Sequence, residues 1–221
     1  MIGFVVALKS EVRSFLEKTE NISESSLAGK PLFTGKYLGE DVAIIISDIG
    51  KVSAALSAQA LIDRYSPELI FNFGTAGAIK GKAEVLSYYF IDKSAQYDLD
   101  LTALEPVPLG FNQGYGRVFF DSLDLETDLE KRTLASSDKF TSERTDIDKI
   151  EKMGCSLFDM EGAAIAQVAL SNGVPFISVK GISDLFGSGS NAEQFAENLS
   201  VIGKNFPAVI EKVLKAFLEK Q

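Results

Sequence analysis

Four polar segments of this sequence come directly after apolar runs that have the length of β-strands. Glu11 lies three residues beyond the first run, and Ser183-Asp184 lies at the end of the last. Between them, the segment 159–161 (Asp-Met-Glu) ends one run and the segment 74–77 (Gly-Thr-Ala-Gly) follows another. In an open α/β sheet, ligands bind outside the carboxyl ends of the strands. The pattern therefore predicts a site rich in carboxylates, which suits acid–base chemistry.

The composition narrows that chemistry further. The 221 residues include no histidine and one cysteine, which excludes Ser-His-Asp and Cys-His catalysis and removes the usual ligands of zinc. The formal net charge of −9 would repel a phosphate backbone, and no stripe of lysine and arginine offsets it. We therefore expect neither a transition metal nor a nucleic acid partner. A small neutral or cationic substrate fits the charge better.

Most of these positions also have a purely structural explanation. Glu11 could be a solvated residue in the first turn of a helix, and Asp184 could cap the helix that follows it. The segment 74–77 could be a plain turn, and it lacks the lysine and the glycine spacing of a phosphate-binding loop. Glu161 differs, because the small residues at 162–166 predict a buried helix beside it. A carboxylate against an apolar wall favours a functional role.

Strand-like and helix-like segments alternate along the chain, which is typical of an α/β fold. Apolar runs predict strands at 2–8, 32–37, 42–47, 69–73, 156–160 and 175–180, and other patterns predict helices at 9–18, 51–64, 162–170 and 205–218. The turn 38–41 has hairpin character, and 83–132 predicts a strand, a loop and a strand. We expect a single domain over residues 1–221, with a mixed, twisted central sheet flanked by helices.

The final predicted helix has one apolar stripe that would pack against this sheet. The stripe residues recur at three- and four-residue spacing and are Phe206, Val209, Ile210, Val213, Leu214 and Phe217. The apolar runs of the chain are far shorter than the roughly 20 residues that span a bilayer. The sequence also opens directly on a strand-like run, without a preceding basic segment. We therefore expect no membrane association and a cytoplasmic location.

Several motifs occur in one order that resembles the methylthioadenosine/S-adenosylhomocysteine nucleosidases of the nucleoside phosphorylase superfamily. They are Ile2–Leu8 with Glu11, Gly50-Lys51-Val52, Asn72-Phe73-Gly74-Thr75-Ala76-Gly77, Asp159-Met160-Glu161-Gly162-Ala163-Ala164 and Ile182-Ser183-Asp184. The resemblance covers most of the chain and is weakest over 83–132. It implies a nucleoside phosphorylase-like fold and hydrolysis of an adenine nucleoside to adenine and a thioribose product. It also implies that no cofactor is needed and that a homodimer closes each site.

Carried over to this chain, the resemblance implies a role for each carboxylate. Asp184, supported by Ser183, would protonate N7 of adenine. Glu11 would hold and deprotonate the attacking water, helped by Thr75 and Lys180. Other implied substrate contacts are Glu161 on the ribose hydroxyls, Met160 against the sugar, Phe140 stacked on adenine, Thr141 at the base edge, and Leu8, Ile49, Ala76 and Asp159. Carboxylates around the sugar would stabilise the oxocarbenium-like transition state, and burial would keep Asp184 protonated.

The chain departs from the resembled families at informative positions. Phosphorylases carry arginines near the first strand and just before the glycine segment, where this chain has Glu11 and Asn72, so water is the expected nucleophile. The nucleosidases commonly have Glu and Arg where this chain has Asp159 and Lys180. Around 101–106 there is no aromatic residue for the 5′ end of a neighbour's substrate.

Alternative functions stay open from the sequence. One is a sister nucleosidase or phosphorylase that acts on futalosine or adenosine. Another is a nucleoside-binding protein without turnover. The Gly/Ser-rich segment 185–193 could be a lid over the site or an ordinary surface connection.

Overall fold

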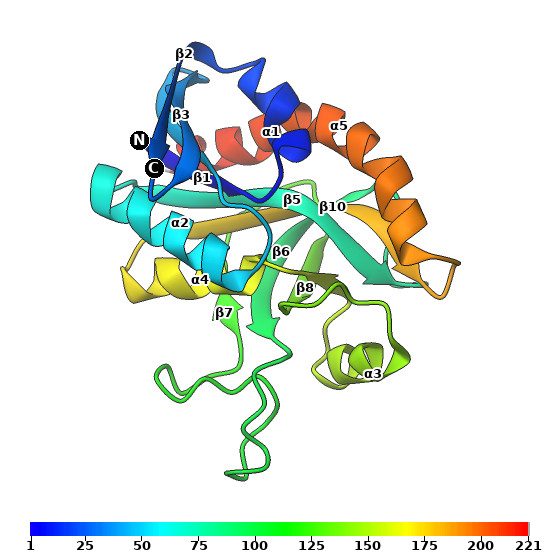
Figure 1. The fold of residues 1–221 in the computed structure, drawn as a ribbon. Helices are drawn as coiled ribbons and strands as arrows, with labels where there is room; N and C mark the ends of the chain where they lie inside the picture. The colour runs from blue at the N-terminus through cyan, green and yellow to red at the C-terminus, as the bar shows by residue number, and fades with distance from the viewer. Residues whose placement is uncertain (221) are drawn as a thin grey trace.

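The computed structural model describes residues 1–220 and has a mixed α/β fold built on one sheet (Figure 1). Its strands are β1 (Ile2–Val6), β2 (Glu20–Leu27), β3 (Lys30–Tyr37), β4 (Glu40–Ile46), β5 (Leu69–Ile79), β6 (Tyr88–Gln96), β7 (Phe120–Asp121), β8 (Lys131–Ser136), β9 (Leu157–Asp159) and β10 (Phe176–Phe186). Its helices are α1 (Lys9–Leu16), α2 (Lys51–Tyr65), α3 (Arg144–Lys152), α4 (Gly162–Ser171) and α5 (Asn191–Glu219). The expected mixed sheet flanked by helices is confirmed.

The sheet closes on itself along part of its length. Its strand order is β10-β6-β8-β9-β5-β1-β4-β3-β2, and β10 also pairs with β5, so five of the strands form a ring. The central pairings of β1 with β4 and with β5 are parallel, whereas the β3–β4 pairing is antiparallel. The hairpin turn between β3 and β4 is confirmed: Leu38 and Gly39 have φ of 53° and 84°, as a type I′ turn needs.

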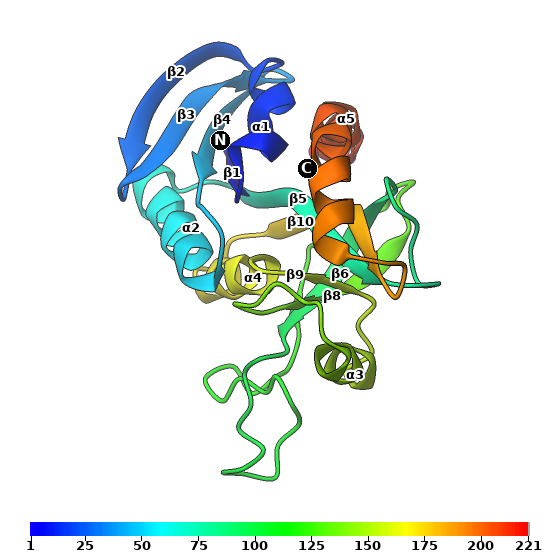
Figure 2. The same cartoon turned by 45° about the vertical axis from the view of Figure 1, so that its right-hand side comes forward.

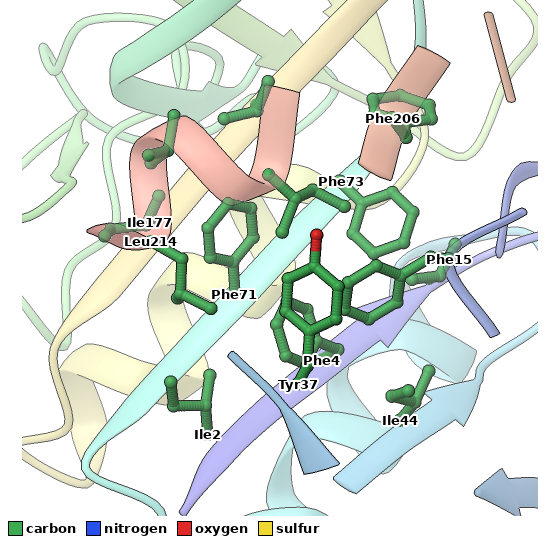
Figure 3. Packing of buried hydrophobic residues seen from close by; sticks show 14 of the residues in the cluster. Ile2, Phe4, Phe15, Tyr37, Ile44, Phe71, Phe73, Ile177, Phe206 and Leu214 are labelled. Atoms are coloured by element: carbon green, nitrogen blue, oxygen red, sulfur yellow. The ribbon is translucent and has the colours of Figure 1, made fainter. Parts of the chain in front are cut away.

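Helices cover both faces of this sheet. In Figure 1, α1 and α5 lie above it and α2 and α4 lie below. The upper layer buries a cluster of aromatic rings from β1, α1, β5 and α5, shown in Figure 3. The predicted apolar stripe of the last helix belongs to this cluster, with Val209 only partly buried. Burial of such aromatic side chains is the main force that fixes the helices on the sheet.

The segment 74–77 is not a turn, as the sequence suggested, but the continuation of β5. Neither Gly74 nor Gly77 has a positive φ, so these glycines do not reverse the chain. They instead let neighbouring side chains come close to the backbone of β5. A Cβ on Gly77 would lie 2.1 Å from Cε2 of Phe158, and a Cβ on Gly74 would lie 3.0 Å from Oε1 of Glu11. The glycines therefore let β5 run directly beneath the site.

The last helix is also longer than predicted. It begins at Asn191 rather than near residue 205, and it continues through Pro207. Its first turns carry polar residues in place of an apolar stripe, so the apolar periodicity could not reveal them. β10 likewise runs to Phe186, past the predicted end at Lys180, so only residues 187–190 connect it to α5.

Two further elements were not predicted. β2 is a polar edge strand with mostly exposed residues, and α3 is a short polar helix. The loop expected between strands in 83–132 is present: residues 97–119 follow β6 and extend away from the body of the molecule (Figures 1 and 2). Within residues 1–220, no helix is both long and apolar enough to cross a membrane.

Candidate active site

One pocket collects every residue that the sequence nominated as a site residue. Its walls come from the residues between β1 and α1, α1 itself, the loop before α2, β5, the loop before α3, β9 and the residues that follow it, β10 and the second turn of α5. The nominated residues on its walls are Leu8, Glu11, Ile49, Thr75, Ala76, Phe140, Thr141, Asp159, Met160, Glu161, Lys180, Ser183 and Asp184. Segments far apart in the chain therefore meet in one pocket, as we predicted from their positions at the ends of strands.

Glu11 is buried on α1 and points across to β5. Its Oε1 atom accepts hydrogen bonds from the backbone N–H of Thr75 at 2.6 Å and from Oγ1 of Thr75 at 2.7 Å. Its Oε2 atom accepts one from the N–H of Leu8 at 3.1 Å. Burial raises the pKa of Glu11, although the Thr75 hydrogen bonds and the charge of Lys180 oppose the shift. Glu11 is thus a partnered, more basic carboxylate rather than a solvated surface residue.

Asp159 and Lys180 form a buried ion pair at the base of the pocket. Nζ of Lys180 lies 2.9 Å from Oδ2 of Asp159. The N–H of Gly162 donates to the same oxygen at 2.8 Å, and Oγ of Ser136 donates to Oδ1. Although burial lowers the pKa of Lys180, the carboxylates around it, Asp159 foremost, raise it more, so the ammonium stays charged.

Glu161 lies beside this pair and is also buried. Its Oε1 atom accepts a hydrogen bond from the N–H of Gly50 at 2.8 Å, at the start of α2. Burial, followed by the charge of Asp159, raises the pKa of Glu161 to about 8, although Lys180 opposes the shift. The pocket therefore places three acidic side chains around a single buried ammonium, and the raised pKa of Glu161 favours its protonated form.

Asp184 lies within β10, where the register with β5 shifts between Ile182 and Asp184. Oγ of Ser183 donates to Oδ1 of Asp184 at 2.6 Å, and Nδ2 of Asn191 donates to Oδ2 at 2.6 Å. Burial raises the pKa of Asp184, against the effect of both hydrogen bonds. The helix cap is Ser190, whose hydroxyl accepts from the N–H of Glu193, so Asp184 is not a capping residue.

Aromatic rings form the outer wall. Phe140 is 41% exposed and meets Phe195 of α5 edge-on, with ring centroids 6.1 Å apart. Phe195 was missed by the sequence reasoning because the first turns of α5 were not recognised as a helix. Lys139 and Phe158 line the pocket as well and were also missed. An exposed ring beside a carboxylate-lined pocket suits a flat, apolar group of a ligand.

Asn72 lies on β5, two residues before Gly74. Its Nδ2 atom donates to the carbonyl of Val5 at 3.0 Å, and its Oδ1 atom accepts from Ser178 at 3.0 Å. Both ends of the amide are therefore used to join β5 to β1 and β10. Within the described chain, no group of three His, Cys, Asp or Glu residues could hold a metal ion.

The family model of the phosphorylase superfamily matches residues 1–215. The fold and the carboxylate-lined pocket thus define an α/β enzyme of that superfamily. Proteins named 5′-methylthioadenosine/S-adenosylhomocysteine nucleosidase from Tolumonas auensis and Bacillus cytotoxicus are each 30% identical to this chain. The alignments cover 97% of this chain and 98% and 99% of those proteins. The chain belongs to the methylthioadenosine/S-adenosylhomocysteine nucleosidase family.

Solved structures agree with this assignment. The nucleosidase of S. pneumoniae, determined with a transition-state inhibitor, has a TM-score of 0.86 and 26% identity. The match covers 98% of this chain and 99% of that one. A futalosine hydrolase from Helicobacter pylori has a TM-score of 0.87 at 22% identity, with 97% of both chains covered, and its likeness concerns the fold alone.

Proposed function

We propose that this enzyme hydrolyses the N-glycosidic bond of methylthioadenosine or S-adenosylhomocysteine, releasing adenine and a thioribose product. Family membership and the buried carboxylates of the pocket support the proposal. In this reaction Asp184 gives its proton to N7 of adenine, so that the purine leaves as a neutral base. The burial that raises the pKa of Asp184 supports this role, because a general acid must hold its proton near neutral pH.

The other carboxylates act on water and on the sugar. Glu11 holds and deprotonates the attacking water, with Thr75 and Lys180 beside it. Glu161 binds the ribose hydroxyls, and Met160 packs against the ring. The remaining contacts are Phe140 stacked on adenine, the backbone of Thr141 at the base edge, and Leu8, Ile49, Ala76, Asp159 and Ser183 around the nucleoside. The carboxylate of Glu11 stabilises a sugar cation that develops only in the transition state.

One observation carries the choice of water over phosphate: both lysines that line the pocket are already paired with acids. Lys180 is 2.9 Å from Asp159, and Lys139 is 2.9 Å and 2.8 Å from Glu143 and Asp146. A phosphate anion needs uncompensated cations or the donor fork of an arginine. Here it would meet the carboxylate of Glu11 instead.

Adenine release from methylthioadenosine, S-adenosylhomocysteine, adenosine and inosine, with and without phosphate, tests the proposal. We expect release from the first two substrates in phosphate-free buffer, at a rate that added phosphate does not raise. Product that forms only with phosphate would indicate a phosphorylase. Binding without any release would indicate a nucleoside-binding protein, and preference for futalosine in the same assay would indicate the sister hydrolase.

We also propose that the enzyme is a homodimer. Ile49, Val52 and Leu56 are 52%, 79% and 49% exposed; Ile49 lies just before α2, and the other two lie in its first two turns. Ile49 lines the pocket as well, so a partner seated on this strip would border the site. Because one sheet carries the pocket walls, we treat the chain as one nucleosidase domain. Its cytoplasmic location stays a prediction that cell fractionation would test.

A further inference from the structure

We propose that Asn191 is a positioning residue for the acid: its side-chain amide holds the Asp184 carboxyl toward the pocket both before and after the proton leaves. The proposal rests on the proposed function, in which Asp184 protonates adenine. It adds a residue from the first turn of α5, a helix start that the sequence did not reveal.

The contact between the two side chains is short and buried. Nδ2 of Asn191 lies 2.6 Å from Oδ2 of Asp184, and the two residues are 7% and 2% exposed. The other carboxyl oxygen, Oδ1, is held by Oγ of Ser183. Each oxygen of the acid therefore has one side-chain partner, and the two partners come from different elements. Removal of Asn191 leaves Oδ2 without this partner, so the carboxyl group can rotate.

Asn191 is the first of three amides on one face of α5 that hold consecutive residues of β10. Oε1 of Gln194 accepts from the N–H of Leu185 at 3.1 Å, and Nδ2 of Asn198 donates to the carbonyl of Ser183 at 2.9 Å. Residues spaced three and four apart lie on the same side of a helix. This face thus clamps the strand on both sides of Asp184, and only Asn191 reaches the carboxyl group itself.

An amide suits this task because its NH₂ group donates to the Asp184 carboxyl group in both protonation states. Both the ionised carboxylate and the protonated acid keep an oxygen that accepts from Nδ2 of Asn191, so the single proton of the acid stays free to go to N7. In the proposed step, the proton moves from Asp184 to N7 while the bond from the ribose carbon to the base nitrogen breaks. The bonding pair stays with the purine, and the new carboxylate accepts from Nδ2 of Asn191.

The proposal has a consequence for pH dependence. The Asn191 hydrogen bond lowers the pKa of Asp184, against the effect of burial, so its removal leaves the acid protonated to higher pH. The other ionisable groups around the pocket are Glu11, Asp159, Glu161, Lys180 and Lys139. The hydrogen bonds that fix Glu11 and Glu161 come from Thr75, Leu8 and Gly50, so loss of the amide leaves them in place.

The test compares pH profiles of kcat/KM for adenine release by the full chain carrying Asn191→Leu, Asn191→Asp or Ser190→Ala. Leucine has the branched shape of asparagine, with two methyl groups in place of the amide oxygen and nitrogen, and its side chain forms no hydrogen bond. We expect Asn191→Leu to lower kcat/KM at neutral pH roughly 10-fold. The alkaline limb of the kcat/KM profile, where Asp184 loses its proton, should move to higher pH by about one unit. Asn191→Asp places a like charge beside Asp184 and should move the alkaline limb further up. An acid in the first turn of a helix stabilises the helix, so this shift would not come from a loss of α5.

Ser190→Ala separates positioning from helix stability, because it removes the cap of α5 without touching Asp184. We expect its pH profile to match the wild type. An unshifted limb in Asn191→Leu, or an equal shift in Ser190→Ala, would overturn the proposal. Asp184→Asn, run in parallel, tests the acid role separately: near-normal turnover in that variant would refute the proposed function, whatever the Asn191 variants do.

Discussion

Lys180 and Asp159 are joined by an ion pair of 2.9 Å whose side chains are only 2% and 1% exposed. Lys180 comes from β10 and Asp159 from the end of β9. The two side chains therefore join neighbouring parts of the pocket wall by direct contact. The pair thus supplies the positive charge among the buried carboxylates of the pocket.

Lys180→Met should destabilise the enzyme strongly. It leaves the Asp159 carboxylate buried without its cation, which costs about 3–5 kcal/mol in comparable pairs. Urea unfolding measures the loss, and Lys180→Met combined with Asp159→Asn should recover part of it. Lys36→Met removes an exposed pair with Asp41 and serves as a control with no measurable loss. Equal stability of Lys180→Met and wild type would contradict this account.

Thr75→Val should weaken catalysis through Glu11. The change keeps the shape of the residue but removes the hydroxyl that lies 2.7 Å from Oε1 of Glu11. We expect kcat/KM to fall roughly 10-fold, because a hydrogen bond to a charged group is lost. That hydrogen bond lowers the pKa of Glu11, so its loss moves the acid limb of the rate to higher pH. Thr75→Ser keeps the hydroxyl and should keep the wild-type profile, and an acid limb unchanged in Thr75→Val would count against Glu11 as the base.

Glu161 should make stability depend on pH. Burial raises its pKa to about 8 in the folded protein, against an ordinary value of 4.5. A raised folded pKa contributes stability that is complete below about pH 4.5 and is lost as the pH rises through about 8. The free energy of unfolding should therefore fall over this range, by something on the order of 4 kcal/mol.

Glu161→Gln should flatten this fall in urea unfolding measured from pH 5 to 8. Some slope should remain, because burial also raises the pKa of Glu11 and of Asp184. Glu17→Gln, at an exposed position of the same residue type, should keep the wild-type slope. If Glu161→Gln also kept that slope, Glu161 would not be the group that titrates.

Gly77→Ala should impair both stability and activity. The new methyl group would lie 2.1 Å from Cε2 of Phe158 and 2.8 Å from Oδ2 of Asp184, so one of these groups must move. Overpacking of this kind costs about 1–3 kcal/mol, and displacement of the acid reduces adenine release. Gly114→Ala is the matched control, since its methyl group would meet nothing closer than 3.5 Å. A Gly77→Ala enzyme with wild-type melting temperature and turnover would disprove the close packing.

Val52→Asp should break the proposed homodimer. It places a charge in the centre of the exposed apolar strip on α2, where a partner would desolvate it. Sedimentation velocity should then show a monomer. A separate assay of adenine release should show a lower rate if the neighbouring subunit closes each site. Val201→Asp, at an exposed position on α5, should leave both unchanged. Identical sedimentation of Val52→Asp and wild type would place the interface elsewhere.

The sequence alone predicted the α/β class and most elements, because apolar periodicity is a local property of the chain. It also nominated Glu11, Glu161 and Asp184, since strand ends gather at one edge of an α/β sheet. It failed where local pattern is weak. The first turns of α5 present amides rather than an apolar stripe, so Asn191 and Phe195 were not found.

Tertiary structure alone decided how these residues act on one another. The glycines of β5 suggested a turn, yet closure of the sheet onto β9 and β10 makes them strand positions that pass beneath Glu11 and Asp184. The sequence determined which carboxylates are present. Their pKa values depend on burial and on partners more than a hundred residues away, as for Glu161 and Gly50. Only the folded chain sets those distances, because Coulomb and desolvation energies follow separation in space rather than along the sequence.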